Sequence, residues 1–151
     1  MLEGWHKMRL LSAREWRWLI QALCLLPLNA LAIRWLGARR WQTALARLTP
    51  RDAAAPANPG QAPHIARLVR IAAERGPFAA NCLQHSLALW WLLQRQGLPS
   101  ELKIGVRLAN RQCEAHAWVE HAGQVLNDSE DVRQRFAPFE GTIFPAGTRF
   151  Q

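Results

Sequence analysis

The sequence predicts an α+β protein in which helices precede a small antiparallel sheet. Apolar residues recur at helical spacing as far as residue 97, with capping signals at two helix starts. From residue 101 the period changes to two, because "ELKIGVRL" alternates apolar and polar side chains. The segment "EAHAWVEHAGQVLND", residues 114–128, then has two strand-like halves around a glycine-containing turn, which indicates a hairpin.

Composition and charge predict one ordinary domain with a basic appendage. The chain has 151 residues, of which 50% are hydrophobic, and a formal net charge of +8. Residues 1–75 hold twelve Lys/Arg and four Asp/Glu, whereas residues 76–151 hold seven of each, so the positive charge belongs to the first half. We therefore expect a basic helical extension (residues 1–48), a linker rich in Pro, Ala, Asn and Gly (49–63) and a second domain (64–151).

Cysteine usage and the N-terminus predict the compartment. Three cysteines without regular spacing argue against a disulfide framework and indicate a reducing environment. The first residues carry charges throughout, without a basic region that leads into an apolar run and a cleavage site. We expect no secretory signal and a cytoplasmic location.

The basic extension is predicted to dock something. Ser12 and Glu15 form a capping box at the start of a helix, and no charged residue occurs between Arg17 and Arg34. That run of sixteen residues contains a proline and falls short of the ~20 apolar residues of a membrane span. A partner-docking face is the first interpretation, since Trp and Arg dominate interface hot spots; packing on the second domain explains the tryptophans equally well, and contact with a membrane interface is a third. The candidate docking residues are Arg14, Trp16, Arg17, Trp18, Arg34 and Trp35.

A cysteine stands at the start of the helix predicted for "NCLQHSLALWWLLQRQG". Asn81 is a suitable N-cap and Gln84 completes a variant of the capping box, so Cys82 becomes the first helical residue. The helix dipole and the unpaired N–H groups there favour thiolate over thiol, as in a nucleophile. Gly97 suits the left-handed position after the helix. The plainer interpretation is a small buried residue, and the nucleophile needs a partner base.

The hairpin offers that base. We expect a three-residue loop, His121-Ala122-Gly123, which pairs Glu120 with Gln124, Trp118 with Leu126, and His116 with Asp128 on one face. With a two-residue loop, Asp128 would lie on the other face. The three-residue loop therefore places a carboxylate against an imidazole.

Cys82, His116 and Asp128 then form a candidate site for covalent acyl transfer. A carboxylate that binds one ring nitrogen of His116 fixes the tautomer and leaves the other nitrogen to accept the thiol proton. Cys113 and His116 also have a Cys-x-x-His spacing, but no second ligand pair accompanies it, so we expect no metal and no cofactor.

Two segments resemble a known family. "NCLQHSLALWWLLQRQGLPSELKIGVR" and "EAHAWVEHAGQVLND" closely resemble the transglutaminase-like cysteine peptidases of lasso-peptide biosynthesis, the stand-alone B-type maturation protease. The resemblance covers residues 81–128, about a third of the chain. It implies a transglutaminase-like or papain-like core, with the Cys on a helix N-terminus and the His and Asp on adjacent antiparallel strands. The chain departs from the family at His85, where an arginine is expected.

The resemblance implies roles for residues and partners. Cys82 would be the nucleophile, His116 the base and Asp128 the orienting acid of a leader peptidase. Its substrate would be a leader-core precursor peptide, delivered by a separate leader-binding recognition-element protein. An ATP-dependent synthetase would then close the macrolactam. Around this triad, the backbone N–H of Cys82, beside the N-cap Asn81, is the expected oxyanion donor, whereas His85 and Trp118 are candidate cleft or substrate contacts.

Two rival functions come from other classes. A basic nucleic-acid-binding module would explain the arginines, but no recognised motif accompanies them and the chain has no Tyr for base stacking. A non-catalytic partner- or membrane-docking adaptor would explain the N-terminus but would leave the Cys, His and Asp without a role. We therefore expect no nucleic-acid partner, and peripheral membrane contact stays open.

Overall fold

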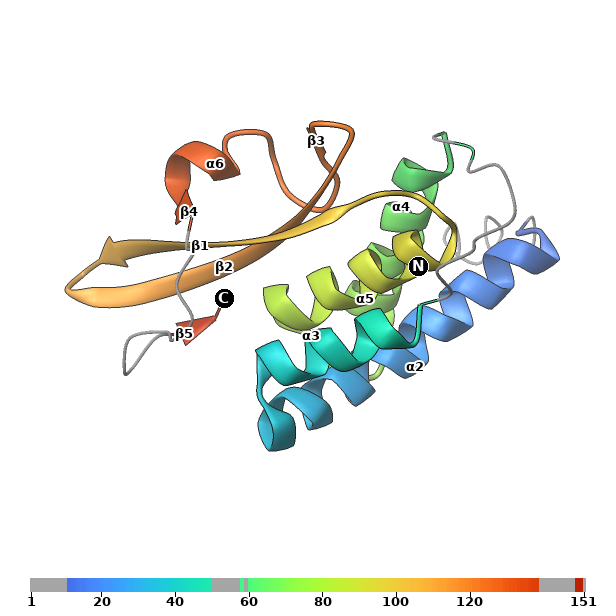
Figure 1. Cartoon of the computed structure of the whole chain (residues 1–151), viewed down its shortest axis with the longest axis horizontal. Coiled ribbons are helices and arrows are strands. Elements are labelled where there is room, and N and C mark those ends of the chain that lie inside the picture. The colour runs from blue at the N-terminus through green and yellow to red at the C-terminus, as the bar shows by residue number, and fades with distance from the viewer. Residues whose placement is uncertain (1–10, 50–57, 59, 139–148, 151) are drawn as a thin grey trace.

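The computed structural model shows a layer of helices against one face of a curled antiparallel sheet, which confirms the predicted α+β fold (Figure 1). It describes residues 11–49, 58, 60–138 and 149–150. The helices are α2 (Ala13–Leu36), α3 (Ala38–Arg47), α4 (Gln61–Arg75), α5 (Cys82–Arg95) and α6 (Val132–Arg135). The strands are β1 (Glu101–Ala109), β2 (Gln112–His121), β3 (Gln124–Val125), β4 (Ala137–Pro138) and β5 (Arg149–Phe150).

The sheet is built on the long β1–β2 hairpin. The two strands pair antiparallel from Glu101 with Glu120 to Ala109 with Gln112, and the strand order is β3-β2-β1-β4, with β5 parallel to β2. Side chains of β2 alternate between two clusters, as period-two geometry requires. Ala117 and Val119 join the helical core, whereas Trp118 packs with Val132 and Phe136 on the opposite face, where α6 lies (Figure 1).

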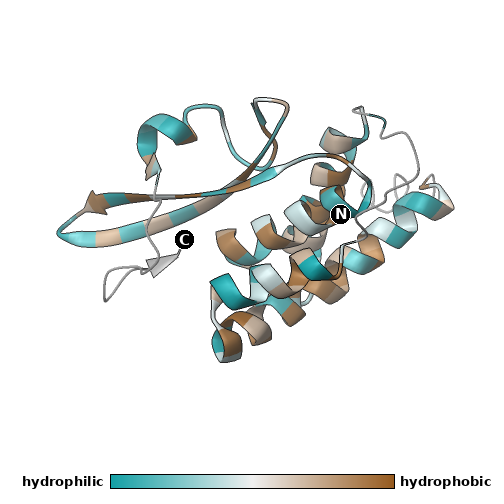
Figure 2. Ribbon diagram, viewed as in Figure 1, coloured by the Kyte–Doolittle hydropathy of each residue, from teal (hydrophilic) through white to brown (hydrophobic). Residues whose placement is uncertain are grey.

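Helices α2 and α3 share one hydrophobic core with α4 and α5. Leu19 of α2, Leu45 of α3, Ile65 of α4 and Leu87 of α5 are all buried in it, and hydrophobic segments are concentrated in these helices (Figure 2). The predicted extension is therefore not separate in its packing, and α4 begins within the predicted linker. Most of that linker, residues 50–57 and 59, lies outside the described residues. It stays a prediction that residues 1–48 recruit a partner while residues 64–151 carry out the catalysis.

Asn29 ties the N-terminal helices to the first turn of α5. It is fully buried; its Nδ2 donates to the Gln84 carbonyl at 2.9 Å, and its Oδ1 accepts from the Trp41 indole at 2.7 Å. A buried amide persists in an apolar core only when such bonds satisfy it. The start of α5 is thus fixed by α2 and α3 together.

Replacing Asn29 with alanine should lower the free energy of unfolding by about 1–3 kcal/mol, because the Trp41 indole N–H would remain buried without its acceptor. Urea unfolding measures the change. Thr43→Ala is the control, since it removes an exposed hydrogen bond within α3 and should have little effect. Equal stabilities of the Asn29 and Thr43 variants would show that the hydrogen bonds of Asn29 do not stabilise the fold.

Candidate active site

Cys82 is the first residue of α5, as the capping pattern predicts. The Asn81 Oδ1 accepts from the Gln84 backbone N–H at 2.9 Å, and the Gln84 Oε1 accepts from the Asn81 N–H at 3.2 Å. The half-buried Cys82 side chain therefore lies at the positive end of the helix dipole. Gly97 has the predicted left-handed φ, at 69°.

Ser86 joins helix α5 to strand β2 at Ala117, the residue after His116. Ser86 follows Cys82 by one turn on the same helix face, and its Oγ donates to the Ala117 carbonyl at 2.9 Å. Helix α5 and strand β2 run in the same direction in Figure 1, so the start of α5, about 6 Å before Ser86, lies toward the part of β2 that precedes Ala117 and includes His116.

His116 and Asp128 are directly bonded. The His116 Nε2 shares a hydrogen bond with the Asp128 Oδ2, and both side chains are about 15% exposed. The other carboxylate oxygen accepts from the Ser129 N–H at 2.7 Å and from Arg135 at 2.6 Å. The second ring nitrogen of His116, Nδ1, is buried without a hydrogen-bond partner among the described residues. The ring is thus anchored on one side and leaves Nδ1 to exchange a proton.

The surroundings of Asp128 keep it ionised. Burial alone would raise its pKa, but the Ser129 N–H, the bond with His116 and the charge of Arg135 outweigh burial, so the pKa lies below the ordinary Asp value. A lowered pKa means that the folded state favours the carboxylate more than the unfolded state does.

The stability that Asp128 contributes should depend on pH. Because the folded-state pKa is lowered, the contribution is complete above the unfolded value of about 4 and is lost as the pH falls through the folded value. The difference in unfolding free energy between the wild type and Asp128→Asn should therefore be constant near neutral pH and shrink below about pH 4. A difference that grows on acidification would contradict this sign.

The hairpin register differs from the prediction, although the pair that it predicted forms. His121 pairs with Gln124 and Glu120 with Val125, so the loop contains two residues, Ala122 and Gly123. Both have positive φ, 49° and 80°, as in a type I′ turn, and this turn suits the twist of the strands. Strand β3 ends at Val125 and the chain then turns, so Asp128 reaches His116 from outside the ladder. The expected three-residue loop was wrong.

Side chains replace strand pairing at the edge of β2 beside the site. The Val119 N–H donates to the Asn127 Oδ1 at 2.8 Å, and the Asn127 Nδ2 donates to the Ser86 Oγ at 2.8 Å. Ser86, fully buried, completes the chain of bonds to the Ala117 carbonyl. Asn127 therefore fixes its neighbour Asp128 relative to both β2 and α5, a role that strand periodicity did not reveal.

Phe136 packs on the face of the His116 ring. The ring centroids are 5.0 Å apart with an interplanar angle of 24°. Gly105 lies opposite His116 on β1, and a Cβ at this position would lie 2.7 Å from the Phe136 Cβ. The glycine thus makes room for the aromatic ring that holds the imidazole. Phe136 is fully buried, whereas the other C-terminal phenylalanine side chains lie outside the described residues.

Trp118 and His85 lie in packed positions. Trp118 is 1% exposed and its indole donates to the Glu120 Oε1 at 2.8 Å, which favours a packing role over the predicted contact with a cleft or substrate. His85 has a buried Nε2, and burial lowers its pKa, while Glu74 of α4 raises it and Arg70 lowers it. These neighbours place His85 toward α4, which favours a packing role over substrate contact.

The docking residues predicted on α2 separate into buried and exposed ones. Trp18 is buried in the core at 3% exposure, so it offers no docking surface and that expectation was wrong. Trp16 and Trp35 are exposed, Trp35 at 77%, and Arg14, Arg17 and Arg34 are also exposed.

Two hollows lie near the sheet. One, of about 390 Å³, borders Asp128 and is lined on the α4 side by Pro63, Arg67 and Arg70. The other, of about 650 Å³, lies near the end of α5 at Gln94 and includes none of the three predicted catalytic residues. In the described part of the chain, no group of three or more His, Cys, Asp or Glu side chains forms a metal site.

Comparisons with known proteins agree with the resemblance seen in the sequence. The profile of the transglutaminase-like superfamily matches residues 22–140, a range that begins inside α2. The microcin J25-processing protein McjB of Escherichia coli is 37% identical over 60 residues. That segment covers 40% of this chain and 28% of the relative, so the match spans under a third of the relative's length. No solved structure matches the chain.

Proposed function

Because the chain belongs to the transglutaminase-like superfamily, we propose that it is a cysteine peptidase that removes the leader from a ribosomally made lasso precursor peptide. The observation that carries this proposal is the bonded His116–Asp128 pair, next to the point where Ser86 joins strand β2 to the helix that begins at Cys82. The family assignment supports the acyl-transfer chemistry, and the relative that processes microcin J25 supports the substrate class.

In the first half of the reaction, the Nδ1 of His116 accepts the proton of the Cys82 thiol. The thiolate attacks the carbonyl carbon of the bond between leader and core and forms a tetrahedral intermediate. The backbone N–H of Cys82 is the proposed donor to its oxyanion, while the N–H of Asn81 is already bonded to Gln84. When the C–N bond breaks, His116 returns its proton to the departing amine, and the leader remains as a thioester on Cys82.

Water completes the reaction. His116 takes a proton from water as the oxygen attacks the thioester carbonyl, the C–S bond breaks, and the sulfur regains a proton. The products are a leader with a free carboxylate and a core peptide with a free N-terminal amine. Asp128 holds the ring and stabilises the imidazolium throughout, for which its lowered pKa suits it.

The proposed partners follow from these products. A free core amine is the nucleophile that a macrolactam synthetase needs, and its activation requires ATP, so a separate synthetase would act next. Delivery of the precursor by a separate leader-binding recognition element completes the proposal. A cytoplasmic location is compatible with the three cysteines, since the described residues contain no disulfide.

Mass spectrometry of a leader-core precursor tests the function. The protein should convert the precursor, in the presence of a leader-binding protein from the same gene neighbourhood, into one leader and one core fragment that together weigh one water more than the precursor. An intact precursor under these conditions, with the protein folded, would overturn the assignment.

A further inference from the structure

The outer face of α2 is apolar, yet its side chains are exposed. The residues Trp16, Ile20, Leu28, Leu31 and Trp35 are 39–77% exposed, and with the exposed Cys24 they follow each other at intervals of three or four, which places them on one helix face. We call these six residues the outer stripe. It is about 28 Å long.

The inner face of α2 is also apolar and is packed in the core. Leu19, Ala22 and Leu26 are buried against the other helices, and Asn29 is bonded to α3 and α5. A helix that is apolar all round is typical of a core or a membrane. Among the described helices, α2 alone is long and apolar enough to cross a membrane, by length and composition only. If α2 crossed a membrane, its inner face would have to leave the protein core. A membrane can therefore contact only the outer stripe while the fold stays intact.

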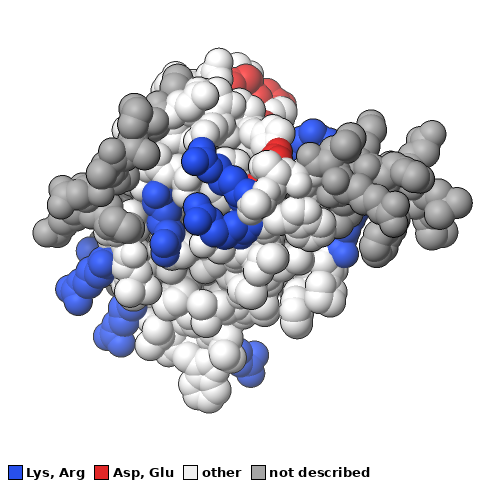
Figure 3. All heavy atoms as spheres, turned by 90° about the vertical axis from the view of Figure 1, so that its right-hand side faces the viewer, with Lys and Arg blue, Asp and Glu red and all other residues white. Residues whose placement is uncertain are grey.

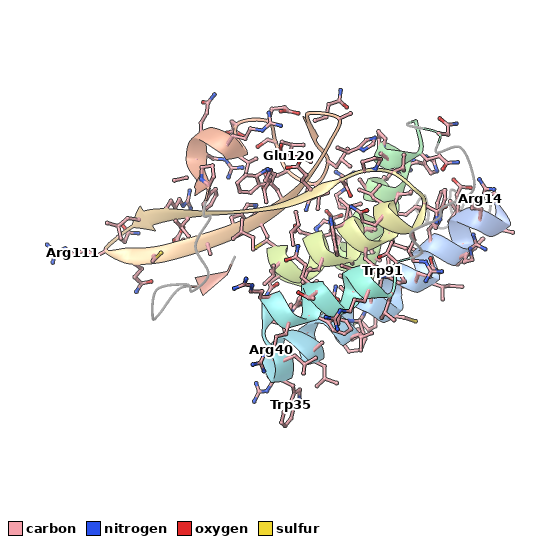
Figure 4. All side chains as sticks on the ribbon, viewed as in Figure 1. Arg14, Trp35, Arg40, Trp91, Arg111 and Glu120 are labelled. Carbon is pink, nitrogen blue, oxygen red and sulfur yellow. The ribbon has the colours of Figure 1, made fainter. Side chains whose placement is uncertain are left out.

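Arginines border both ends of the outer stripe. Residues 11–49 contain six arginines and a single acidic residue, Glu15, which is bonded to Ser12 and His64. Arg14 lies at one end of α2, and Arg40 lies near Trp35 at the other, both directed away from the sheet (Figure 4). On the face shown in Figure 3, basic side chains surround a largely uncharged lower part, while acidic ones are confined to the upper part.

Helix α3 adds a basic hollow beside the end of the stripe. The hollow has a volume of about 490 Å³ and is lined by Arg39, Arg40, Thr43, Ala44 and Arg47, without an acidic residue. Guanidinium groups bind phosphate oxygens well, because their geometry allows paired hydrogen bonds.

From these observations we infer that the outer stripe and the α3 arginines bind the surface of a membrane that contains anionic lipids. Tryptophans at both ends of an apolar stripe suit the boundary between headgroups and acyl chains, and the arginines suit the phosphates above it. Arginines at both ends of this long helix complement an anionic bilayer. This inference does not depend on the peptidase activity.

Vesicle sedimentation of the full chain tests the inference. The protein should sediment with vesicles of phosphatidylcholine mixed with phosphatidylglycerol, less with phosphatidylcholine alone, and progressively less as salt rises. Arg39→Glu with Arg40→Glu should lower the partition coefficient at least about tenfold. Arg111→Glu, an exposed arginine at the β1–β2 turn, is the matched control and should change it little (Figure 4).

A second pair of variants tests the contribution of the apolar outer stripe to vesicle binding. Leu31→Glu with Trp35→Glu should also lower binding about tenfold or more, because both side chains leave the lipid. Leu108→Glu replaces a leucine that is 79% exposed on β1, and it should retain binding. Circular dichroism melting checks that all variants fold.

Three results would overturn the inference: equal sedimentation with both vesicle types, equal losses in the stripe and control variants, or a lipid-free dimer that only the stripe variants dissociate. The last result would assign the stripe to a second copy of the chain. Measured without a precursor, vesicle binding succeeds or fails independently of leader cleavage.

Discussion

Cys82→Ala should lower the rate of leader removal ~10³-fold or more while the protein remains folded. The substitution removes the sulfur that forms the covalent intermediate. It leaves the capping bonds of Asn81 and Gln84 intact, since neither involves the Cys82 side chain. The rate of precursor cleavage, measured by mass spectrometry, gives the effect, and thermal unfolding checks the fold.

The other two cysteines are the controls for this prediction. Cys24 is exposed on α2, and Cys113 lies near the start of β2, away from the bond between Ser86 and Ala117. Cys24→Ala and Cys113→Ala should therefore cleave at nearly the wild-type rate. Cleavage by Cys82→Ala at that rate would refute the peptidase mechanism.

His116→Ala should inactivate the protein nearly as fully as Cys82→Ala, and Asp128→Asn should be damaging but less so. Alanine at 116 removes the proton acceptor. An amide at 128 can still hold the ring but cannot stabilise the imidazolium, and the same change of the orienting acid in a serine peptidase costs about 10⁴-fold. Single-turnover cleavage rates measure both effects.

Asp131→Asn is the matched control for Asp128→Asn. Asp131 lies in the same segment and also pairs with Arg135, at 3.3 Å, but the bond to His116 belongs to Asp128. The control should retain most of the activity. If Asp128→Asn cleaved as fast as the wild type, the His116–Asp128 bond would be structural only.

Local signals predicted the start of helix α5, which bears Cys82, well. The capping boxes at Ser12 and at Asn81 both form, because each depends on side chains three residues apart in one turn. The change of period at residue 101 predicted β1 for the same reason. Helix caps and strand alternation depend on residues close together in the chain, so they can be predicted from the sequence alone.

The environment of His116 depends on distant segments, and the sequence did not predict it. The two-residue turn at Ala122 changes the register, yet the chain leaves the strand at Asn127 and still brings Asp128 to His116. The stacking of Phe136 needs the space left by Gly105 on another strand. Helical and strand periodicity in the sequence does not indicate these tertiary contacts.

The burial of the α2 tryptophans also depends on tertiary packing that the sequence pattern does not indicate. The sequence leaves both docking and packing open for Trp16, Trp18 and Trp35; in the structure Trp18 is buried in the core, whereas Trp16 and Trp35 are exposed. Because α2 is apolar on both faces, the pattern alone did not indicate which face packs. The packing of α4 and α5 decides it.

The central claim is that Cys82 carries the leader as a thioester, and intact-mass analysis of an acid-quenched reaction tests it most directly. Protein mixed with precursor and quenched before the turnover is complete should gain the mass of the leader minus one water. Peptide mapping should place this adduct on Cys82, and hydroxylamine should release it. Cleavage of the precursor without any adduct on Cys82, or with the adduct on Cys24 or Cys113, would contradict the account.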